Sequence, residues 1–150
     1  MNAQKLSQRL AKVASFVPTG AVVADIGSDH AYLPCYLVHN GVASRAIAGE
    51  VVQGPYESAV RQVRTEGLSS KIEVRLADGL AAVKEEDNVD TITICGMGGP
   101  LIVSILMKNP EGLKHTTRLI LQPNIHAKVI REWALNNGWA IQDEAIIKED

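Results

Sequence analysis

The sequence is poor in cysteine and in aromatic residues. Its 150 residues include two cysteines, and aromatic side chains make up 4% of the total. Cys35 and Cys95 lie far apart without the C-x-x-C spacing of zinc ligands. In a cytosolic protein this pattern also argues against a structural disulfide. We therefore expect two reduced core thiols and no bound metal.

The sequence also lacks the patterns of a membrane span and of a secretory signal. Its longest uncharged run, residues 91–107, falls short of the roughly 20 residues that a span needs and is interrupted by glycines and a proline. The N-terminus carries spaced basic residues on an amphipathic pattern, with no apolar core before a cleavage site. We expect a cytoplasmic protein that does not contact a membrane.

Positive charge is not in excess. Fifteen Lys and Arg residues face 17 Asp and Glu residues, which gives a net charge of −2. Such a chain has no global attraction to phosphate, so any contact with nucleic acid needs a local basic patch or another domain. Hydrophobic residues make up 46% of this length, which predicts one folded domain over residues 1–150.

Apolar runs of β type alternate with segments of helical periodicity. The expected strands cover residues 22–26, 44–49, 72–77, 89–95, 117–121 and 139–147. The expected helices cover residues 6–17, 33–40, 54–64, 101–108 and 125–137, with a short helix reaching residue 84 and Asn124 as the cap of the last helix. This order predicts a three-layer α/β domain with a doubly wound, mostly parallel sheet.

The first expected strand ends on Asp25 and turns through Gly27 into a helix. In such sheets ligands bind beyond the carboxyl ends of the strands, where a glycine lets the backbone approach the ligand. The dinucleotide fingerprint needs two further glycines, and this chain has Asp29 and Tyr32 at those places. The turn therefore disfavours a nicotinamide-dependent oxidoreductase and is typical of S-adenosylmethionine-dependent methyltransferases.

Two further acidic residues end strands. Glu50 follows Asp25 by 25 residues, near the place where doubly wound folds put an acceptor for ribose hydroxyls. Asp78 stands at the end of the third strand, where its carboxylate can accept from the amino group of an adenine ring. Asp78 is also suited to cap the next helix, and both roles can hold together.

Residues 96–100, Gly-Met-Gly-Gly-Pro, follow the fourth strand. Three glycines in four residues permit unusual backbone angles and the close approach of a ligand. A plain tight turn is the alternative, although a simple strand-to-helix turn does not need so many glycines.

Five ordered motifs together resemble the bacterial TrmK family. They are Ala24–Pro34, Gly49–Pro55, Ala77–Leu80, Cys95–Gly99 and Leu119–Asn124. The resemblance implies a Rossmann-like S-adenosylmethionine-dependent enzyme that methylates N1 of an adenine at position twenty-two, in the D-arm region of tRNA. Family members continue with a last strand and a C-terminal helical domain that helps to hold tRNA. The resemblance therefore implies that this chain is the catalytic domain.

The resemblance also implies the residues of a methyl-donor site, which yields S-adenosylhomocysteine as product. They are Asp25, Gly27, Glu50, Asp78, Gly79, Leu80 and Gly96. In this site Gly27 admits the amino-acid end of the donor, Glu50 takes the ribose hydroxyls, and Asp78 with the Leu80 N–H frames the adenine. Asp25 orders the turn or holds the ammonium of the donor through water.

Adenine N1 has its own lone pair, so attack on the sulfonium methyl needs positioning more than a strong base. The methylated product is a cation, and Asp29 is a candidate to stabilise its charge. His30 is a candidate to take a proton or orient the base. The alternative is that Asp29 caps the following helix and His30 is a wall residue.

N1 lies on the Watson–Crick edge, so the target base must be unpaired or extruded. The candidates to stack on it, left unranked, are Tyr32, Tyr56 and Met97, with Gly98 on the same substrate face. The candidates to contact tRNA phosphates are Lys5, Arg9 and Lys12, which helical spacing places on one face; a solvated helix face is the alternative. A small-molecule methyltransferase and a donor-binding module without transfer activity remain open alternatives.

Overall fold

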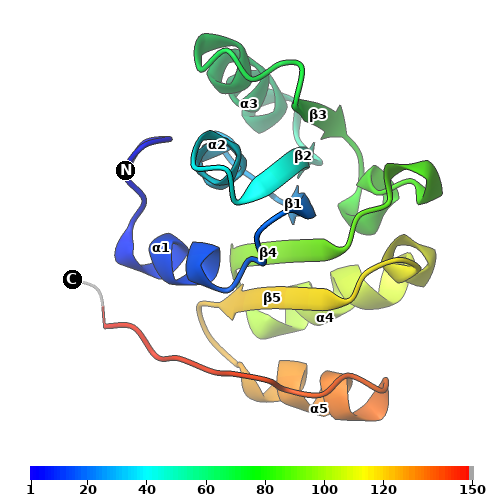
Figure 1. The fold of residues 1–150 in the computed structure, drawn as a ribbon. Coiled ribbons are helices and arrows are strands. Elements are labelled where there is room, and N and C mark those ends of the chain that lie inside the picture. Colours follow the sequence, from blue (N-terminus) through cyan, green and yellow to red (C-terminus); the bar gives the residue numbers. More distant parts are fainter. Residues whose placement is uncertain (149–150) are drawn as a thin grey trace.

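The computed structural model describes residues 1–148, which form a sheet of five parallel strands (Figure 1). The strands are β1 (Ala21–Ile26), β2 (Ala43–Glu50), β3 (Ile72–Leu76), β4 (Thr91–Met97) and β5 (Arg118–Pro123). Their order is β3-β2-β1-β4-β5, and every neighbouring pair is parallel. The strand order reverses between β1 and β4, the position where open α/β sheets bind ligands. The predicted α/β fold class is confirmed.

Helices cover both faces of the sheet. They are α1 (Gln8–Ser15), α2 (Tyr32–His39), α3 (Gln53–Thr65), α4 (Gly99–Lys108) and α5 (Lys128–Asn136), with 3₁₀ turns η1 (Gly79–Ala82), η2 (Glu85–Asp87) and η3 (Pro110–Leu113). Side chains of α1, α2 and α3 share one buried cluster with the sheet, and those of η1, α4 and α5 share the other. None of the helices within residues 1–148 is long and apolar enough to cross a membrane.

Strand β4 is buried on both faces, as expected for a central parallel strand. Ile92 and Ile94 pack in the cluster beneath α4 and α5. Successive side chains of a strand point to opposite faces, so Thr91 and Thr93 point the other way. A buried hydroxyl needs a partner, and Thr93 finds one in Asp25 on β1.

The predicted sixth strand, residues 139–147, is wrong. This segment has no strand structure and runs past α5 (Figure 1). Three contacts hold it to the helix layer: Trp139 stacks on Trp133 at 6.4 Å between ring centroids, the Trp139 N–H donates to the Ala134 carbonyl at 2.9 Å, and Arg131 Nε donates to Glu144 Oε1 at 2.7 Å. The alternating pattern was read as a strand, but alternation alone does not supply a neighbouring strand to pair with.

Two helix starts also differ from the prediction. Helix α1 begins at Gln8, with Ser7 as its cap, so Lys5 lies outside it in a turn held by the Asn2 side chain. Helix α5 begins at Lys128, and Asn124 does not cap it. The Asn124 N–H instead donates to the Met97 carbonyl at 2.8 Å, which joins the ends of β4 and β5.

The buried face of β4 gives a stability prediction. Ile94 is 0% exposed, whereas Ile146 is 97% exposed. Ile94→Ala should lower the free energy of unfolding by about 2–5 kcal/mol, because it removes buried methyl groups and leaves a cavity. Urea denaturation followed by circular dichroism measures the change.

The matched control is Ile146→Ala, which should change the free energy of unfolding by less than about 0.5 kcal/mol. Equal effects of the two substitutions would contradict the placement of Ile94 in the core.

Candidate functional site

The turn after β1 approaches its neighbours closely. The Gly27 N–H donates to the Gly49 carbonyl at 2.9 Å, which ties the turn to the end of β2. Gly27 has a φ of +71°, and a Cβ placed on it would lie 2.4 Å from Met97 Cε. The backbone angle therefore favours glycine, and any other side chain would also displace the flexible end of Met97.

Asp25 uses both of its carboxylate oxygens inside the protein. Its side chain is 4% exposed, Oδ1 accepts from Thr93 Oγ1 and Oδ2 accepts from Ser28 Oγ, each at 2.7 Å. Burial raises the pKa of Asp25 to about 6, although both hydrogen bonds favour the charged form. Asp25 thus joins β1 to β4 and to the Gly27 turn.

Glu50 has an unused acceptor. It is 6% exposed, and no donor among residues 1–148 reaches its buried Oε2. Burial raises its pKa to about 7; the Asp29 N–H hydrogen bond opposes this, and the charges of Asp25 and Asp29 add to it. A buried carboxylate oxygen without a donor is costly, and a vicinal diol would supply the missing hydrogen bond. Glu50 therefore fits a ribose.

The turn places Asp29 and His30 beside each other. Asp29 has a φ of +49°, and its Oδ1 lies 3.7 Å from His30 Nε2. The other ring nitrogen of His30, Nδ1, lies 2.5 Å from Ser58 Oγ of α3, and the ring stacks on Tyr32 at 5.2 Å. These contacts fix the imidazole and leave the exposed Asp29 carboxylate next to it.

The alternative role of Asp29 as a helix cap is wrong. The cap of α2 is Ala31, with a φ of +55° and no side-chain hydrogen bond to the helix. The left-handed conformations of Asp29 and Ala31 carry the chain into α2 without a side-chain cap.

Asp78 does not use its side chain as a cap either. It precedes η1 without a side-chain cap, and its Oδ2 instead pairs with Lys108 Nζ of α4. Gly79 has a φ of +56°, and Leu80 is buried beneath the turn. The Asp78 carboxylate is exposed, so a ligand donor can replace Lys108 there.

Val51, next to Glu50, adds an exposed apolar side chain at the same edge of the sheet.

The glycines at the end of β4 contact neighbouring elements closely. The Gly96 N–H donates to Gln122 Oε1 at 2.9 Å, and the same oxygen accepts from Arg9 Nη1 at 2.7 Å. Gly98 precedes α4, and a Cβ on Gly99 would lie 2.0 Å from the His126 carbonyl oxygen. The loop is therefore locked between α1, β5 and the segment before α5.

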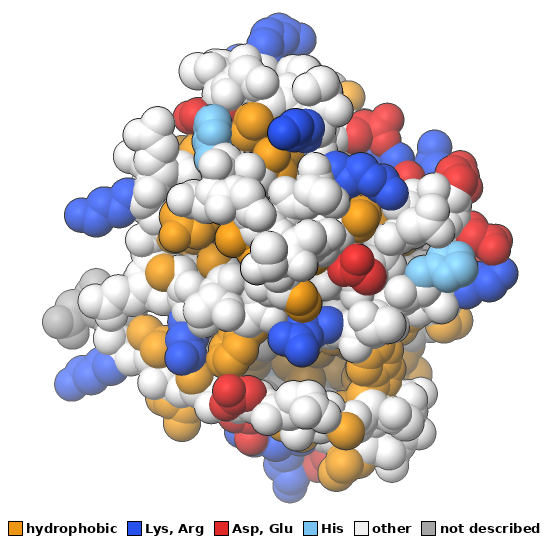
Figure 2. Space-filling view, viewed as in Figure 1, with side chains coloured by type: hydrophobic (Ala, Val, Ile, Leu, Met, Phe, Trp, Pro, Cys, Tyr) orange, Lys and Arg blue, Asp and Glu red, His pale blue; other side chains and the backbone are white. Residues whose placement is uncertain are grey.

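The three basic residues of the N-terminus do not share a helical face. Lys5 precedes α1, and the Lys12 ammonium lies 5.2 Å from the centre of the Phe16 ring. Arg9 alone reaches the glycine loop, through Gln122. Figure 2 shows Lys and Arg side chains scattered over this view of the molecule, among acidic and apolar patches.

Sequence reasoning assigned no role to four residues that position the site. They are Ser28, Ser58, Thr93 and Gln122. Ser28 and Gln122 lie inside two of the five motifs that resemble the TrmK family, and this position is the sequence signal that could have identified them. The roles of Ser58 and Thr93 depend on which residues of α3 and β4 face the turn. The rotation of α3 and the register of β4 decide this. No three His, Cys, Asp or Glu side chains of residues 1–148 form a group that could hold a metal.

The raised pKa values predict a pH dependence of stability. The folded pKa values of Asp25, about 6, and Glu50, about 7, exceed their ordinary values of 3.8 and 4.5. The folded chain therefore retains protons that the unfolded chain has released, so these groups lower stability as pH rises from about 4.5 to about 7. Glu50→Gln removes one such group and should flatten this fall, measured by urea denaturation at pH 5 and pH 8.

The exposed Glu86→Gln provides the control and should leave the pH dependence as in the unaltered protein. If Glu50→Gln shows the same pH dependence as that control, Glu50 does not titrate in this range.

Comparisons with known proteins give the relatives of this chain. The family model of TrmK, tRNA (adenine(22)-N(1))-methyltransferase, matches residues 23–150. The curated tRNA (adenine(22)-N(1))-methyltransferase of Bacillus subtilis is 57% identical over 150 residues, which are 100% of this chain and 63% of the relative.

Two solved structures are similar over nearly the whole chain. An uncharacterized protein from Listeria monocytogenes has a TM-score of 0.96 and 55% identity, over 97% of this chain and 64% of that chain. A putative tRNA (m1A22) methyltransferase of Streptococcus pneumoniae, solved in complex with S-adenosyl-L-methionine, has a TM-score of 0.94 and 53% identity, over 97% of this chain and 68% of that chain. Because the family model covers residues 23–150 and the curated relative is 57% identical, this chain belongs to the TrmK family.

Proposed function

We propose that residues 1–150 form a catalytic domain that transfers a methyl group from S-adenosylmethionine to N1 of adenine 22 in tRNA. The observation that carries the proposal is the buried, unpartnered Oε2 of Glu50 beside the Gly27 turn. The names of the relatives support the substrate, and the S. pneumoniae relative binds the donor. The chain spans 63% of the length of the curated B. subtilis relative.

In this proposal the donor lies across the ends of β1, β2 and β3. Glu50 accepts from the ribose hydroxyls, and Asp78 with the Leu80 N–H frames the adenine. The Gly27 turn faces the amino-acid end. When the adenine amino group binds, Asp78 gives up its exposed ion pair with Lys108 and accepts a hydrogen bond from the ligand. This exchange costs little free energy, because exposed ion pairs contribute little to stability.

The reaction is one displacement. The N1 lone pair attacks the methyl carbon in line with the C–S bond; that bond breaks, its electron pair stays on sulfur, and S-adenosylhomocysteine leaves. Positive charge passes from sulfur to the methylated adenine. The Asp29 carboxylate stabilises this charge, and its effect grows when the bound base excludes water.

The target base enters extruded from the tRNA, because N1 is otherwise paired or stacked. Tyr32 and His30 offer a stacked pair of rings at the entrance, and Ser58 fixes the His30 ring. Met97 lies against Gly27, where its flexible thioether can adjust to the base. Gly96 and Gly98 add no side chain of their own at the methyl-transfer side, and the side chains of Arg9 and Ile125 lie next to them.

The test is transfer of labelled methyl from S-adenosylmethionine to unmodified bacterial tRNA by this chain. A methyl group on N1 blocks pairing, so reverse transcription stops at the modified adenine. A single stop at adenine 22 supports the proposal. Donor binding measured by calorimetry, with no transfer, would leave a donor-binding module and would contradict it.

Asp29→Asn should lower kcat by about tenfold to a hundredfold, because it removes the charge that faces the developing cation. Asparagine tolerates the positive φ at this position, so the turn and its N–H to Glu50 persist. Donor affinity, measured by calorimetry, should therefore stay within about twofold.

The control for this variant is Asp143→Asn, which neutralises an exposed carboxylate on the segment after α5. An unchanged kcat for Asp29→Asn would contradict the role of Asp29 in charge stabilisation.

A further inference from the structure

A groove of about 560 Å³ lies between α3 and the edge strand β3, outside the proposed donor site. Four cationic side chains line it, together with two carboxylates. They are Arg45, Arg64, Lys71 and Arg75, with Glu73 and Asp87. The groove therefore carries more positive than negative charge, although the whole chain has a net charge of −2.

Both carboxylates are occupied by one arginine. Arg75 Nη1 lies 2.6 Å from Asp87 Oδ2, and Arg75 also pairs with Glu73. The hydrogen bonds to Asp87 and Glu73 raise the pKa of the Arg75 guanidinium. Among residues 1–148 no carboxylate lies within ion-pair distance of Arg64 or Lys71. These charges are free to bind an external anion.

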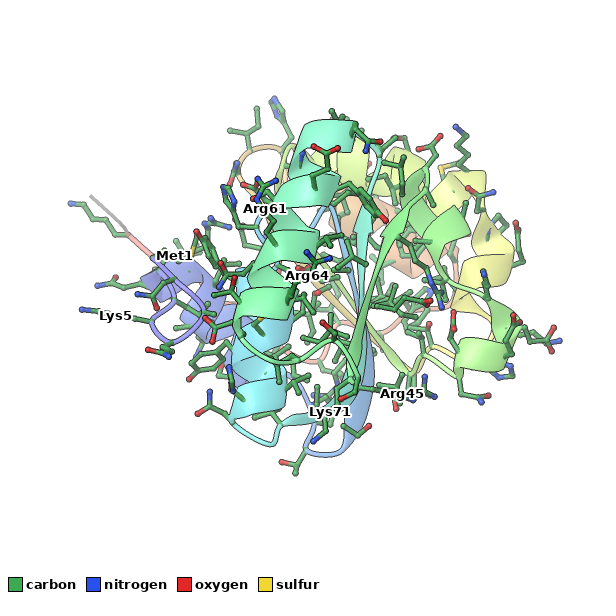
Figure 3. The ribbon with its side chains drawn as sticks, turned by 90° about the horizontal axis from the view of Figure 1, so that it is seen from above. Met1, Lys5, Arg45, Arg61, Arg64 and Lys71 are labelled. Carbon is green, nitrogen blue, oxygen red and sulfur yellow. The ribbon has the colours of Figure 1, made fainter. Side chains whose placement is uncertain are left out.

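The cations without an ion pair come from three segments, β2 with Arg45, α3 with Arg64 and the turn before β3 with Lys71. Arg45 Nη2 also donates to the Asp87 carbonyl at 2.5 Å. The Ala46 N–H of β2 donates to the Lys71 carbonyl at 2.9 Å, which puts Lys71 beside the start of β2 and next to Arg45. Arg61 precedes Arg64 by three residues on α3 but does not line the groove. Figure 3 shows the two arginines along α3 and the other two cations where β2 and β3 begin, with Lys5 apart near α1.

The groove leads back toward the proposed active site. Tyr56 lines its other end, eight residues before Arg64, or about 12 Å along the helix. Ser58 follows Tyr56 by two residues, so it lies on the opposite side of α3, where it contacts His30. A strand of nucleic acid that reaches His30 can therefore cross α3 and enter the groove beside Arg64 and Lys71.

We propose that this groove binds the phosphodiester backbone of tRNA at a distance from the methylated base. The inference rests on the proposed function and extends it with a second contact surface. Unpaired Arg and Lys side chains with exposed serine hydroxyls, here Ser69 and Ser70, are the groups that contact phosphate oxygens. Such contacts position the tRNA without reading its sequence.

The test compares two triple variants that remove the same charge. The groove variant is Arg45→Gln, Arg64→Gln and Lys71→Gln; the control variant is Lys114→Gln, Lys128→Gln and Lys148→Gln, at exposed sites elsewhere. Fluorescence anisotropy of labelled tRNA is measured over a salt series, and thermal unfolding verifies that both variants fold.

At low salt the groove variant should bind tRNA about tenfold or more weakly than the unaltered chain. The slope of log Kd against log salt concentration should be smaller by about 2 to 3 for this variant. The control variant should stay within about twofold of the unaltered chain. Equal losses in both variants, or tRNA binding unchanged in the groove variant, would overturn the proposal. Loss of binding to polyglutamate with unchanged tRNA binding would assign the groove to an acidic protein instead and would also overturn it.

Calorimetry with S-adenosylmethionine separates this inference from the proposed function. If the unaltered chain binds the donor and methylates tRNA while the groove variant binds tRNA normally, only the groove proposal fails. If the unaltered chain binds neither donor nor tRNA, both proposals fail.

Discussion

The carboxyl edge of the sheet depends on the two hydrogen bonds that the buried Asp25 carboxylate accepts. Thr93 on β4 donates one and Ser28 in the following turn donates the other. Together they fix the turn between β1 and α2, whose Gly27 N–H and Ser28 N–H donate to the Gly49 carbonyl, next to Glu50. One buried carboxylate therefore sets the geometry around a second one, which keeps an oxygen free.

The two carboxylates have different roles, since Asp25 stabilises the fold and Glu50 keeps an oxygen for a ligand. Asp25 has both oxygens satisfied, so hydrogen bonds that hold three segments together offset part of its desolvation. Glu50 has a buried oxygen without a donor, and this costs the free protein stability. A ligand hydroxyl recovers that cost on binding, so the unsatisfied acceptor favours the bound state. Unsatisfied buried groups of this kind are uncommon in folded proteins, and they concentrate at functional sites.

Much of this arrangement could be predicted from the sequence because parallel strands place their carboxyl ends at one edge. Asp25, Glu50 and Asp78 each end a strand, and Gly27 marks the turn, so the edge was expected without knowing any contact. The roles of Thr93 and Ser58 could not be predicted in this way. They depend on which residues face the turn, and only the register of β4 and the rotation of α3 decide that.

The errors had a common physical origin, because local patterns do not identify a partner. Residues 139–147 alternate like a strand, yet Trp139 packs on Trp133 and the segment follows α5. Lys5 has helical spacing to Arg9, yet the helix begins after it, at Gln8. The groove cations were missed for the same reason, since Arg45, Arg64 and Lys71 are far apart in sequence and meet only in the folded chain.

Helix α3 connects the two surfaces of the molecule. Its first half supports His30 through Ser58, and its second half carries Arg64 at the groove. The helix follows directly on the Glu50 strand end, so the donor site, the proposed base site and the groove lie along one continuous stretch of chain. Rigid packing of Ala59 and Val63 against the sheet keeps them in register.

The central claim is that Glu50 binds the ribose of the donor, and calorimetry with two ligands tests it most directly. The ligands are S-adenosylhomocysteine and its analogue without the 2′-hydroxyl and 3′-hydroxyl groups. The unaltered chain should bind the analogue about tenfold or more weakly, because a hydrogen bond to a buried charge is lost, and Glu50→Gln should discriminate far less between the two. Equal affinity of the unaltered chain for both ligands would contradict the claim.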